Sequence, residues 1–295
     1  MSGGPFQRFL GVDLGGGKGK KTALAVLEAT GDGVAVSGLF PRTGEPPLYD
    51  AQLVSALSDR QEGALLCVDA PLTLPPCVRC EVPVCPGQQS CVDPSVVEMR
   101  RLAGTPAPGE LAGTRDGRRG KPEITPYTQR PTEVYLRQRR GILAREALGQ
   151  GMGPLTSRAL FLRRALAGLF ALDENLIEVY PKATLELSNL GEPYKKRPDA
   201  RLRILSLLPG LTFAPGVWRE SCVQNDHAFD AIVCAYTGYL FAREAWQMPE
   251  DCAAVPARDG WIWSPPARAS QGGERSVDGP SDLAPADEPR RRNVY

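Results

Sequence analysis

Aspartates follow two short apolar runs in the first quarter of the chain, and this arrangement is the first indication of chemistry. Phe9 to Asp13 and Ala64 to Asp69 each read as a buried strand with an acid at its carboxyl end. Because Asp has a low strand preference, such an aspartate suggests a carboxylate directed at a site, although an Asp before glycines is also typical of a solvated turn. Two close carboxylates repel unless a proton or a cation lies between them, and oxygen ligands of this kind suit Mg²⁺ or Mn²⁺.

A helix near residue 230 adds an imidazole and more acids to this set. The apolar spacing predicts a helix from Asp226 to Trp246, on which His227 and Asp230 lie three positions apart and share a face. Both side chains could therefore reach one metal ion. The simpler alternatives are a structural hydrogen bond for His227, the only histidine, and helix capping for Asp226.

Four of the eight cysteines lie close together in the order Cys77-x2-Cys80-x4-Cys85-x5-Cys91. This spacing is typical of thiolates that close a tetrahedral metal site. The first residues of the chain do not resemble a secretory signal, so metal ligation is favoured over disulfides. Zn²⁺ is the first expectation, with an iron–sulfur cluster and free or redox-active thiols as equal alternatives, because spacing alone does not distinguish the soft-ligand metals.

Hydrophobic periodicity predicts the elements that must position these residues. The expected strands are 9–13, 22–28, 33–40, 64–69 and 175–181, and the expected helices are 50–57, 132–140, 157–172, 199–208 and 226–246. Residues 261–263 are interpreted as a short strand or packing segment. A helical crossover usually leaves the second strand parallel to an earlier one, so the strand ending at Asp69 is expected beside the strand ending at Asp13. In matching register the two aspartates would be neighbours.

Length and composition, with 295 residues of which 42% are hydrophobic and 23% charged, fit an ordinary globular chain. We interpret residues 1–264 as one domain with a long cysteine-rich insertion at about 74–131, and residues 265–295 as a disordered tail. The net charge of +1 gives no general attraction to polyanions. Because apolar runs stay below the roughly 18 residues that span a bilayer, the expected location is the cytoplasm without membrane contact.

Several basic segments could contact phosphates, although such runs are more often solvated faces. They are residues 100–101, 115–121, 137–140 and 195–197. The glycine-rich tip after Asp13 also carries Lys18, Lys20 and Lys21, which could guide a polyanion toward the acid.

Five short motifs follow one another along residues 9–245, namely Gly11-Val12-Asp13, Val68 to Leu72, Tyr127 to Glu133, Glu178 to Pro181 and His227 to Tyr236. In their order and spacing the chain resembles a family of predicted nucleases of otherwise unknown function with a ribonuclease H-like fold, distantly similar to Holliday-junction resolvases. The resemblance implies an α/β domain with a mixed five-stranded sheet and flanking helices. It also implies two divalent metal ions that activate water and stabilise the leaving oxygen during phosphodiester cleavage.

The resemblance assigns roles to individual residues. Asp13 matches the acid of the first strand, Asp69 that of the fourth strand and Asp230 that of the final helix. His227 stands where that helix carries a second acid or a histidine in some relatives, and Asp226 beside it could substitute.

Three further residues match motifs of the family, and a fourth is an expected ion-pair partner. Glu178 matches the family's own motif without a secure counterpart in the resolvases, and its alternative role is an ion pair with a lysine such as Lys182. Arg130 and Glu133 are second-tier candidates, for which the simpler interpretation is a helix start capped by Thr132.

We therefore predict a divalent-metal-dependent nuclease acting on nucleic acid, and we keep two alternatives. An Asp before a glycine hairpin also opens sugar kinases and ATPases of the actin-like superfold, so an ATP-dependent phosphotransferase is the first alternative. Residues 15–21 do not fit G-x-x-x-x-G-K-[ST], and no second glycine-rich loop follows Asp69, which weakens it. The second alternative is a non-catalytic, metal-containing module that binds nucleic acid.

Overall fold

A mixed sheet forms the centre of the protein in the computed structural model, which describes residues 5–16, 21–41, 44–104, 124–217, 219–255 and 257–266. In this part of the chain seven strands follow the order β6-β3-β2-β1-β4-β5-β7. Their bounds are β1 (Arg8–Asp13), β2 (Ala23–Ala29), β3 (Val34–Phe40), β4 (Ala64–Asp69), β5 (Leu176–Val179), β6 (Leu211–Phe213) and β7 (Ile262–Trp263). β2 runs antiparallel to both β1 and β3, whereas β4 is parallel to β1 and β5 is parallel to β4.

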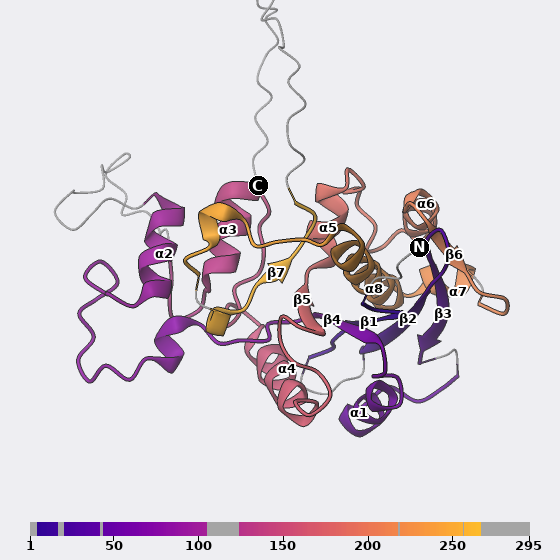
Figure 1. The fold of residues 1–295 in the computed structure, drawn as a ribbon, viewed down its shortest axis with the longest axis horizontal. Helices are drawn as coiled ribbons and strands as arrows, with labels where there is room; N and C mark the ends of the chain where they lie inside the picture. The colour runs from indigo at the N-terminus through magenta and orange to yellow at the C-terminus, as the bar shows by residue number, and fades with distance from the viewer. Residues whose placement is uncertain are drawn as a thin grey trace, which may run out of the picture.

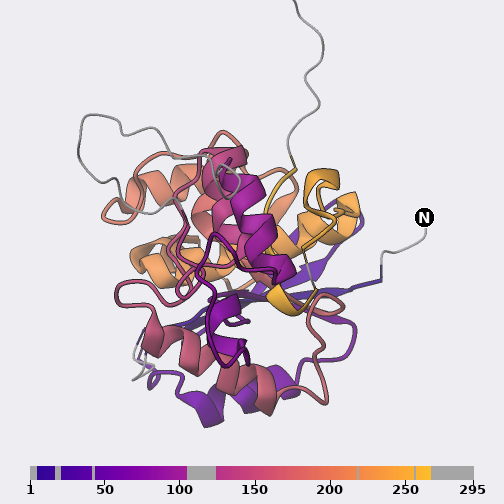
Figure 2. The same cartoon turned by 90° about the vertical axis from the view of Figure 1, so that its left-hand side faces the viewer.

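Helices cover both faces of this sheet (Figure 1), and Figure 2 shows the sheet nearly edge-on between the two layers. The α-helices of the described residues are α1 (Asp50–Ser58), α2 (Pro94–Ala103), α3 (Pro131–Arg140), α4 (Gly153–Ala165), α5 (Pro181–Leu187), α6 (Pro198–Leu207), α7 (Arg219–Gln224) and α8 (Asp226–Glu244). Short 3-10 turns are η1 (Pro76–Arg79), η2 (Glu250–Cys252) and η3 (Ala257–Asp259). Among these helices, none combines the length and the apolar character that a membrane span would need.

Alternating side chains of β1 enter two separate cores, as expected for a strand covered on both faces. Leu10 and Val12 belong to the core that includes buried residues of α1 and α4, whereas Phe9 belongs to the core on the opposite face and contacts Tyr239 of α8. Both faces of the strand are thus buried. This explains why β1 reads as a continuous apolar run in the sequence.

α8 lies unusually close to β1. Every residue from Ala228 to Leu240 is buried, as is typical of a helix enclosed by protein. A Cβ atom on Gly11 would overlap the backbone of Ala231 and Ala235, and a Cβ atom on Gly238 would overlap the Cys67 sulfur atom. Glycine at positions 11 and 238 therefore permits direct contact between helix and sheet. This contact sets where the first turns of α8 lie relative to the end of β1.

The structure confirms the main predicted elements and corrects others. The predicted parallel pairing of the strands ending at Asp13 and Asp69 is confirmed. The expectation of five strands was wrong, because the short strands β6 and β7 extend the sheet at its two edges. The helix predicted over 157–172 begins earlier and ends earlier, as α4.

Helices α2, α5 and α7 were absent from the prediction. Pro181 was interpreted as the end of a strand, but it also begins α5. The first N–H groups of a helix have no partner within it, so the N–H that proline lacks is not needed there. α2 lies inside the supposed insertion and packs against α3. Its start is marked by Asp93, whose carboxylate accepts a hydrogen bond from the Ser95 backbone N–H. Residues 105–123 of the insertion and all but the first two residues of the predicted tail lie outside the described residues.

The contact at Gly11 gives a stability test. We expect Gly11→Ala to lower the free energy of unfolding by at least about 1–3 kcal/mol. The new methyl group would overlap the helix backbone, which, unlike a side chain, cannot rotate away. Chemical denaturation measures this change. Gly31→Ala is the matched control, since its methyl group would enter open space. Equal effects at the two positions would contradict the close contact between α8 and β1.

Candidate functional site

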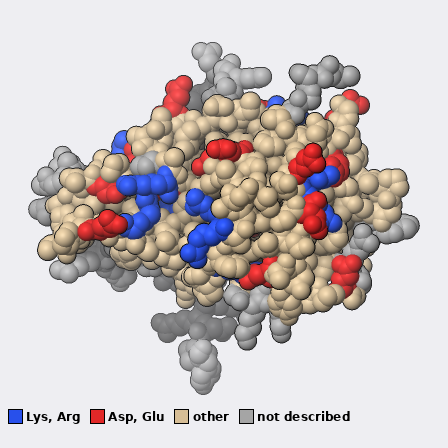
Figure 3. Space-filling model, turned by 60° about the horizontal axis from the view of Figure 1, so that its bottom comes forward, with Lys and Arg blue, Asp and Glu red and all other residues tan. Residues whose placement is uncertain are grey.

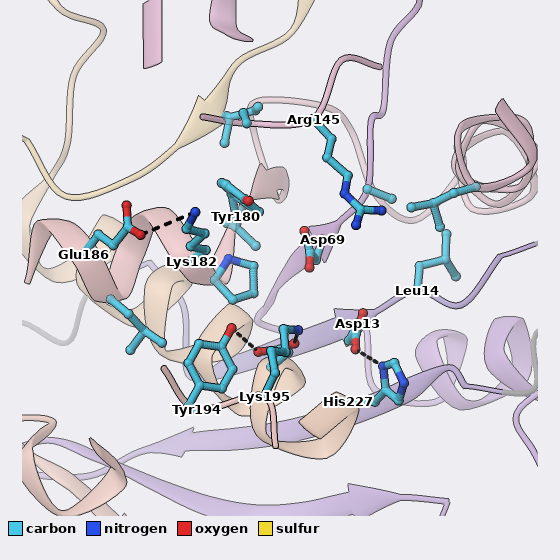
Figure 4. A pocket seen from close by; sticks show the side chains of 18 of the residues that line it. Asp13, Leu14, Asp69, Arg145, Tyr180, Lys182, Glu186, Tyr194, Lys195 and His227 are labelled. Carbon is cyan, nitrogen blue, oxygen red and sulfur yellow. Dashed lines mark hydrogen bonds and ion pairs between the residues drawn. The ribbon is translucent and has the colours of Figure 1, made fainter. Parts of the chain in front are cut away.

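Asp13 and Asp69 lie side by side where β1 and β4 end. They are partners in the parallel register of the two strands. Both residues line a cavity of about 1010 Å³, and Figure 4 shows their carboxylates directed into it. The cavity therefore opens at the carboxyl ends of two adjacent parallel strands, the position where open α/β sheets commonly bind ligands.

His227 reaches the same cavity from the start of α8. Its Nδ1 lies 2.6 Å from Asp13 Oδ2, and this hydrogen bond is the main reason why the pKa of His227 is raised. The capping role considered for Asp226 belongs instead to Asn225, whose side chain accepts a hydrogen bond from the His227 backbone N–H at 2.9 Å. Asp226 Oδ1 lies 3.8 Å from His227 Nε2. His227 is therefore held between two acids.

Asp230 enters the cavity one turn further along α8. Its side chain is almost fully buried, with the Tyr194 hydroxyl donating to Oδ1 at 2.8 Å and the Lys195 ammonium in contact with Oδ2. Burial raises the pKa of Asp230 to about 6, while the charge of Lys195 opposes this rise. No sequence pattern predicted a role for Tyr194, and Lys195 was noted only as part of a basic run.

The three carboxylates act on one another electrostatically. Burial raises the pKa of Asp69 well above its usual range, and the negative charges of Asp13 and Asp230 raise it further. Full ionisation of the cluster thus requires added positive charge. Among the described residues, no three His, Cys, Asp or Glu side chains already stand at metal-binding spacing. A divalent cation would have to draw the carboxylates together and displace Lys195.

Basic side chains line the same cavity as the acids. They are Lys21, Arg130, Arg145, Lys182, Lys195, Lys196 and Arg197. Lys18 and Lys20 lie outside the described residues. The lining also includes Glu186 and Glu192, and the face drawn in Figure 3 likewise has basic groups beside acidic ones. The three aspartates therefore share the cavity with several positive charges.

Arg130 and Glu178 form a buried ion pair at the inner wall of the cavity. Arg130 is fully buried and donates to both carboxylate oxygens of Glu178, at 2.6 and 2.7 Å. Arg130 also contacts Glu133, its partner three positions along the chain. Glu178 Oε2 accepts a further hydrogen bond from the backbone N–H of Leu72, just beyond β4. This network joins β5 to the start of α3 and to the segment that follows Asp69.

Two predicted contacts near this network differ from the structure. Lys182 lies 3.5 Å from Glu186, one turn away on α5, rather than on Glu178. Thr132 does not cap α3, because Arg130 is the capping residue and the Thr132 hydroxyl accepts a hydrogen bond from the Ile262 backbone N–H. The arginine takes the partner expected for a lysine because its planar guanidinium can bind both oxygens of a buried carboxylate.

The eight cysteines fall into two groups. Cys67, Cys222, Cys234 and Cys252 are buried in the core. Cys77 is exposed in η1, Cys80 and Cys85 are exposed in the segment between η1 and α2, and Cys91 in that segment is half-buried; all four have free thiols. Burial raises the pKa of Cys77, and the charges of Cys91, Cys85 and Cys80 raise it further.

The buried ion pair gives a stability test. Arg130→Met would leave Glu133 and Glu178 buried without their counter-ion, so we expect the free energy of unfolding to fall by about 3–5 kcal/mol. Urea denaturation measures the change. Arg203→Met is the matched control, because it removes an exposed pair with Glu192 and should change stability little. Similar losses of unfolding free energy in the two variants would contradict a larger contribution from the buried ion pair than from the exposed one.

Asp230 gives a pH test. Because its folded-state pKa is raised to about 6 from an unfolded value near 3.9, the folded protein binds the proton more tightly. Asp230 therefore favours folding at low pH, and this contribution is lost as the pH rises through about 6. Asparagine does not titrate, so the stability of Asp230→Asn relative to wild type should increase by about 1 kcal/mol from about pH 5 to about pH 8.

Urea denaturation at the two pH values measures this difference. Asp32→Asn, in an exposed turn, is the matched control, and its difference from wild type should not follow the same trend. A constant difference for Asp230→Asn would contradict a raised pKa at this position.

Comparison with known proteins identifies the family of the chain. Residues 11–254 match the family model described as "Protein of unknown function (DUF429)". No curated protein and no solved structure gives a significant match. The match spans the sheet from β1 to β5 together with α8, and so includes the acids of the cavity. This protein therefore belongs to the DUF429 family of proteins of unknown function.

Proposed function

We propose that this protein is a divalent-metal-dependent nuclease that hydrolyses phosphodiester bonds. The single observation that carries the proposal is the meeting of three acids in one cavity. Asp13 and Asp69 come from adjacent parallel strands, and Asp230 comes from the helix packed on them. Carboxylates from several elements that share a buried site are a common means of holding Mg²⁺ or Mn²⁺.

The strand order supports a ribonuclease H-like core for this proposal. The five central strands, β3-β2-β1-β4-β5, form a mixed sheet in which the first three are antiparallel neighbours and the last two are parallel to β1. This agrees with the mixed five-stranded sheet implied by the resemblance to predicted nucleases. β6 and β7 are then additions at the two edges, and Ile262 of β7 contributes to the lining of the cavity.

The electrostatics of the cavity favour a cation there. Asp69 and Asp230 have raised pKa values because they are buried together with Asp13. A divalent ion would relieve this repulsion, and metal binding would release any protons that the carboxylates hold. Bound Mg²⁺ or Mn²⁺ would supply activation of water and stabilisation of the leaving oxygen. In this scheme Asp13, Asp69 and Asp230 hold the metal.

His227 and Lys195 are placed to assist. The imidazole holds Asp13 by a 2.6 Å hydrogen bond, so it can orient that carboxylate and take up a proton. Lys195 contacts Asp230, yet 58% of its side chain is exposed. A metal ion would compete for Asp230, and Lys195 could then turn toward a phosphate.

The basic residues that line the cavity suit an anionic substrate, and phosphate is the anion that all candidate substrates share. Lys196 and Arg197 follow Lys195 in the same loop, while Lys21 and Arg145 line the cavity from other segments. Charges arranged around an acidic floor can hold a phosphate backbone while the metal ions act on one linkage. Glu178, bound to Arg130, contributes by fixing the wall of this cavity rather than as a free carboxylate.

A cleavage assay tests the proposed activity. The full chain, with Mg²⁺ or Mn²⁺, is incubated with a panel of single-stranded, duplex and branched DNA and RNA. Loss of a metal ligand removes several kcal/mol of transition-state stabilisation, so Asp13→Asn and Asp69→Asn should each cut the rate at least about 100-fold. Asp32→Asn, on the exposed turn after β2, should retain the wild-type rate.

The outcomes separate the candidate functions. Equal trace cleavage by wild type and Asp13→Asn would reject the nuclease, as would activity that persists in excess chelator. Hydrolysis of ATP without nucleic-acid cleavage would indicate a phosphotransferase or ATPase instead. Salt-sensitive nucleic-acid binding that survives Asp69→Asn, with no turnover, would indicate a non-catalytic module.

A further inference from the structure

We propose that the loop from Cys77 to Cys91 is a structural zinc site, in which the four cysteine thiolates hold one Zn²⁺ ion. This site is separate from the acids of the cavity in both position and chemistry. Carboxylates there suit a hard ion such as Mg²⁺, whereas thiolates select a soft or borderline metal. The loop therefore has its own ligand, independent of the proposed nuclease activity.

The first argument is the packing of the loop. Every residue from Cys80 to Ser90 is exposed except Gln88, which is half-buried. Val82, Val84 and Val92 expose 58%, 80% and 87% of their surface, so the apolar side chains of this segment do not form a core. A long loop without secondary structure costs conformational entropy to order, and hydrophobic burial does not offset that cost here. A bound metal that cross-links the loop would.

The second argument is that the protein anchors both ends of the loop. At the start, the Cys77 backbone N–H donates to the Pro126 carbonyl at 3.0 Å, and Arg79 pairs with the fully buried Asp259. At the end, the Arg100 guanidinium donates to the carbonyls of Gln88 and Cys91. These contacts fix the backbone at the two ends of the loop. The other two thiols, Cys80 and Cys85, lie on the exposed segment between these ends.

The third argument is the state of the sulfur atoms. All four cysteines have free thiols, and Cys77, Cys80 and Cys85 are exposed. Among the described residues, no three of them stand at metal-binding spacing, so a Zn²⁺ ion would have to draw the thiolates together. An exposed segment that hydrophobic packing does not hold can make this rearrangement.

Zinc fits this loop better than an iron–sulfur cluster. Cys77-x2-Cys80 and Cys80-x4-Cys85 fall within the spacing that structural zinc sites use. Cys77, Cys80 and Cys85 are all exposed, and zinc has no redox chemistry that solvent would disturb. The core cysteines, by contrast, are buried and serve in packing.

The site also lies close to the wall of the acidic cavity. η1, which carries Cys77 and Arg79, follows Asp69 by a few residues, and Arg79 pairs with Asp259. The backbone carbonyl of Asp259 accepts a hydrogen bond from Thr73, and the Thr73 hydroxyl in turn accepts one from Arg130. A metal-fixed loop would therefore hold in place the segment that leads away from Asp69.

Metal analysis of the purified full chain tests the proposal. We expect about one zinc per chain in wild type and a large loss of zinc in Cys80→Ala and Cys85→Ala. Cys252→Ala, which removes a thiol from the core, and Asp69→Asn, which alters the acidic cavity, should both keep the zinc. Circular dichroism establishes that each variant is folded. Because none of these measurements uses catalysis, the result stands whether or not the protein cleaves nucleic acid.

Two measurements on wild-type protein keep the test independent of variant folding. After chelation and reconstitution with Co²⁺, we expect the visible bands of tetrahedral cobalt with thiolate charge transfer. Chelation should also speed cleavage after Glu81 by a glutamate-specific protease, and added Zn²⁺ should restore resistance. Iron with acid-labile sulfide in anaerobically purified protein would overturn the zinc assignment. Protein with neither metal that also fails to bind Co²⁺ would overturn the site itself.

Discussion

The close contact between α8 and β1 is the constraint on which the rest of the site depends. Without a side chain at Gly11, the backbone of α8 can lie directly on the strand. The first turns of the helix then project His227 and Asp230 toward the carboxyl ends of β1 and β4. A larger residue at position 11 would move the helix outward, and the acids of the helix and the sheet would no longer share one cavity.

This packing concentrates negative charge, and the protein compensates in two ways. Within the cavity, His227 and Lys195 contact Asp13 and Asp230, and both contacts are accessible enough to be rearranged by a ligand. In the wall, Arg130 neutralises Glu178 and Glu133 in a fully buried network that solvent does not reach. The first arrangement suits binding and chemistry. The second suits a fixed framework, because a buried ion pair is costly to break.

Two regions of the chain offer different ligand chemistry a short distance apart in sequence. Asp69 is the last residue of β4, and its carboxylate oxygens face a cavity that basic residues also line. Cys77 begins a solvent-exposed loop that presents sulfur. The same physical reason underlies both proposals. In both, the type of donor atom decides which cation would bind.

Local sequence patterns were enough to predict the framework of the site. Apolar runs and the crossover rule were enough to predict that β1 and β4 are parallel neighbours, and helical spacing was enough to place His227 and Asp230 on one helix face. These features follow from local periodicity. Local capping signals could also have revealed α2, because Asp93 and Pro94 mark its start and Gly104 marks its end.

The tertiary structure alone decided the partners of the acids. Tyr194 and Lys195 reach Asp230 from about 35 positions away, and Arg130 reaches Glu178 from 48 positions away. No periodic pattern encodes such pairings, because they depend on how a loop folds over a helix and how two elements cross. The sequence determined which elements carry the acids, and three-dimensional packing decided which charges meet them.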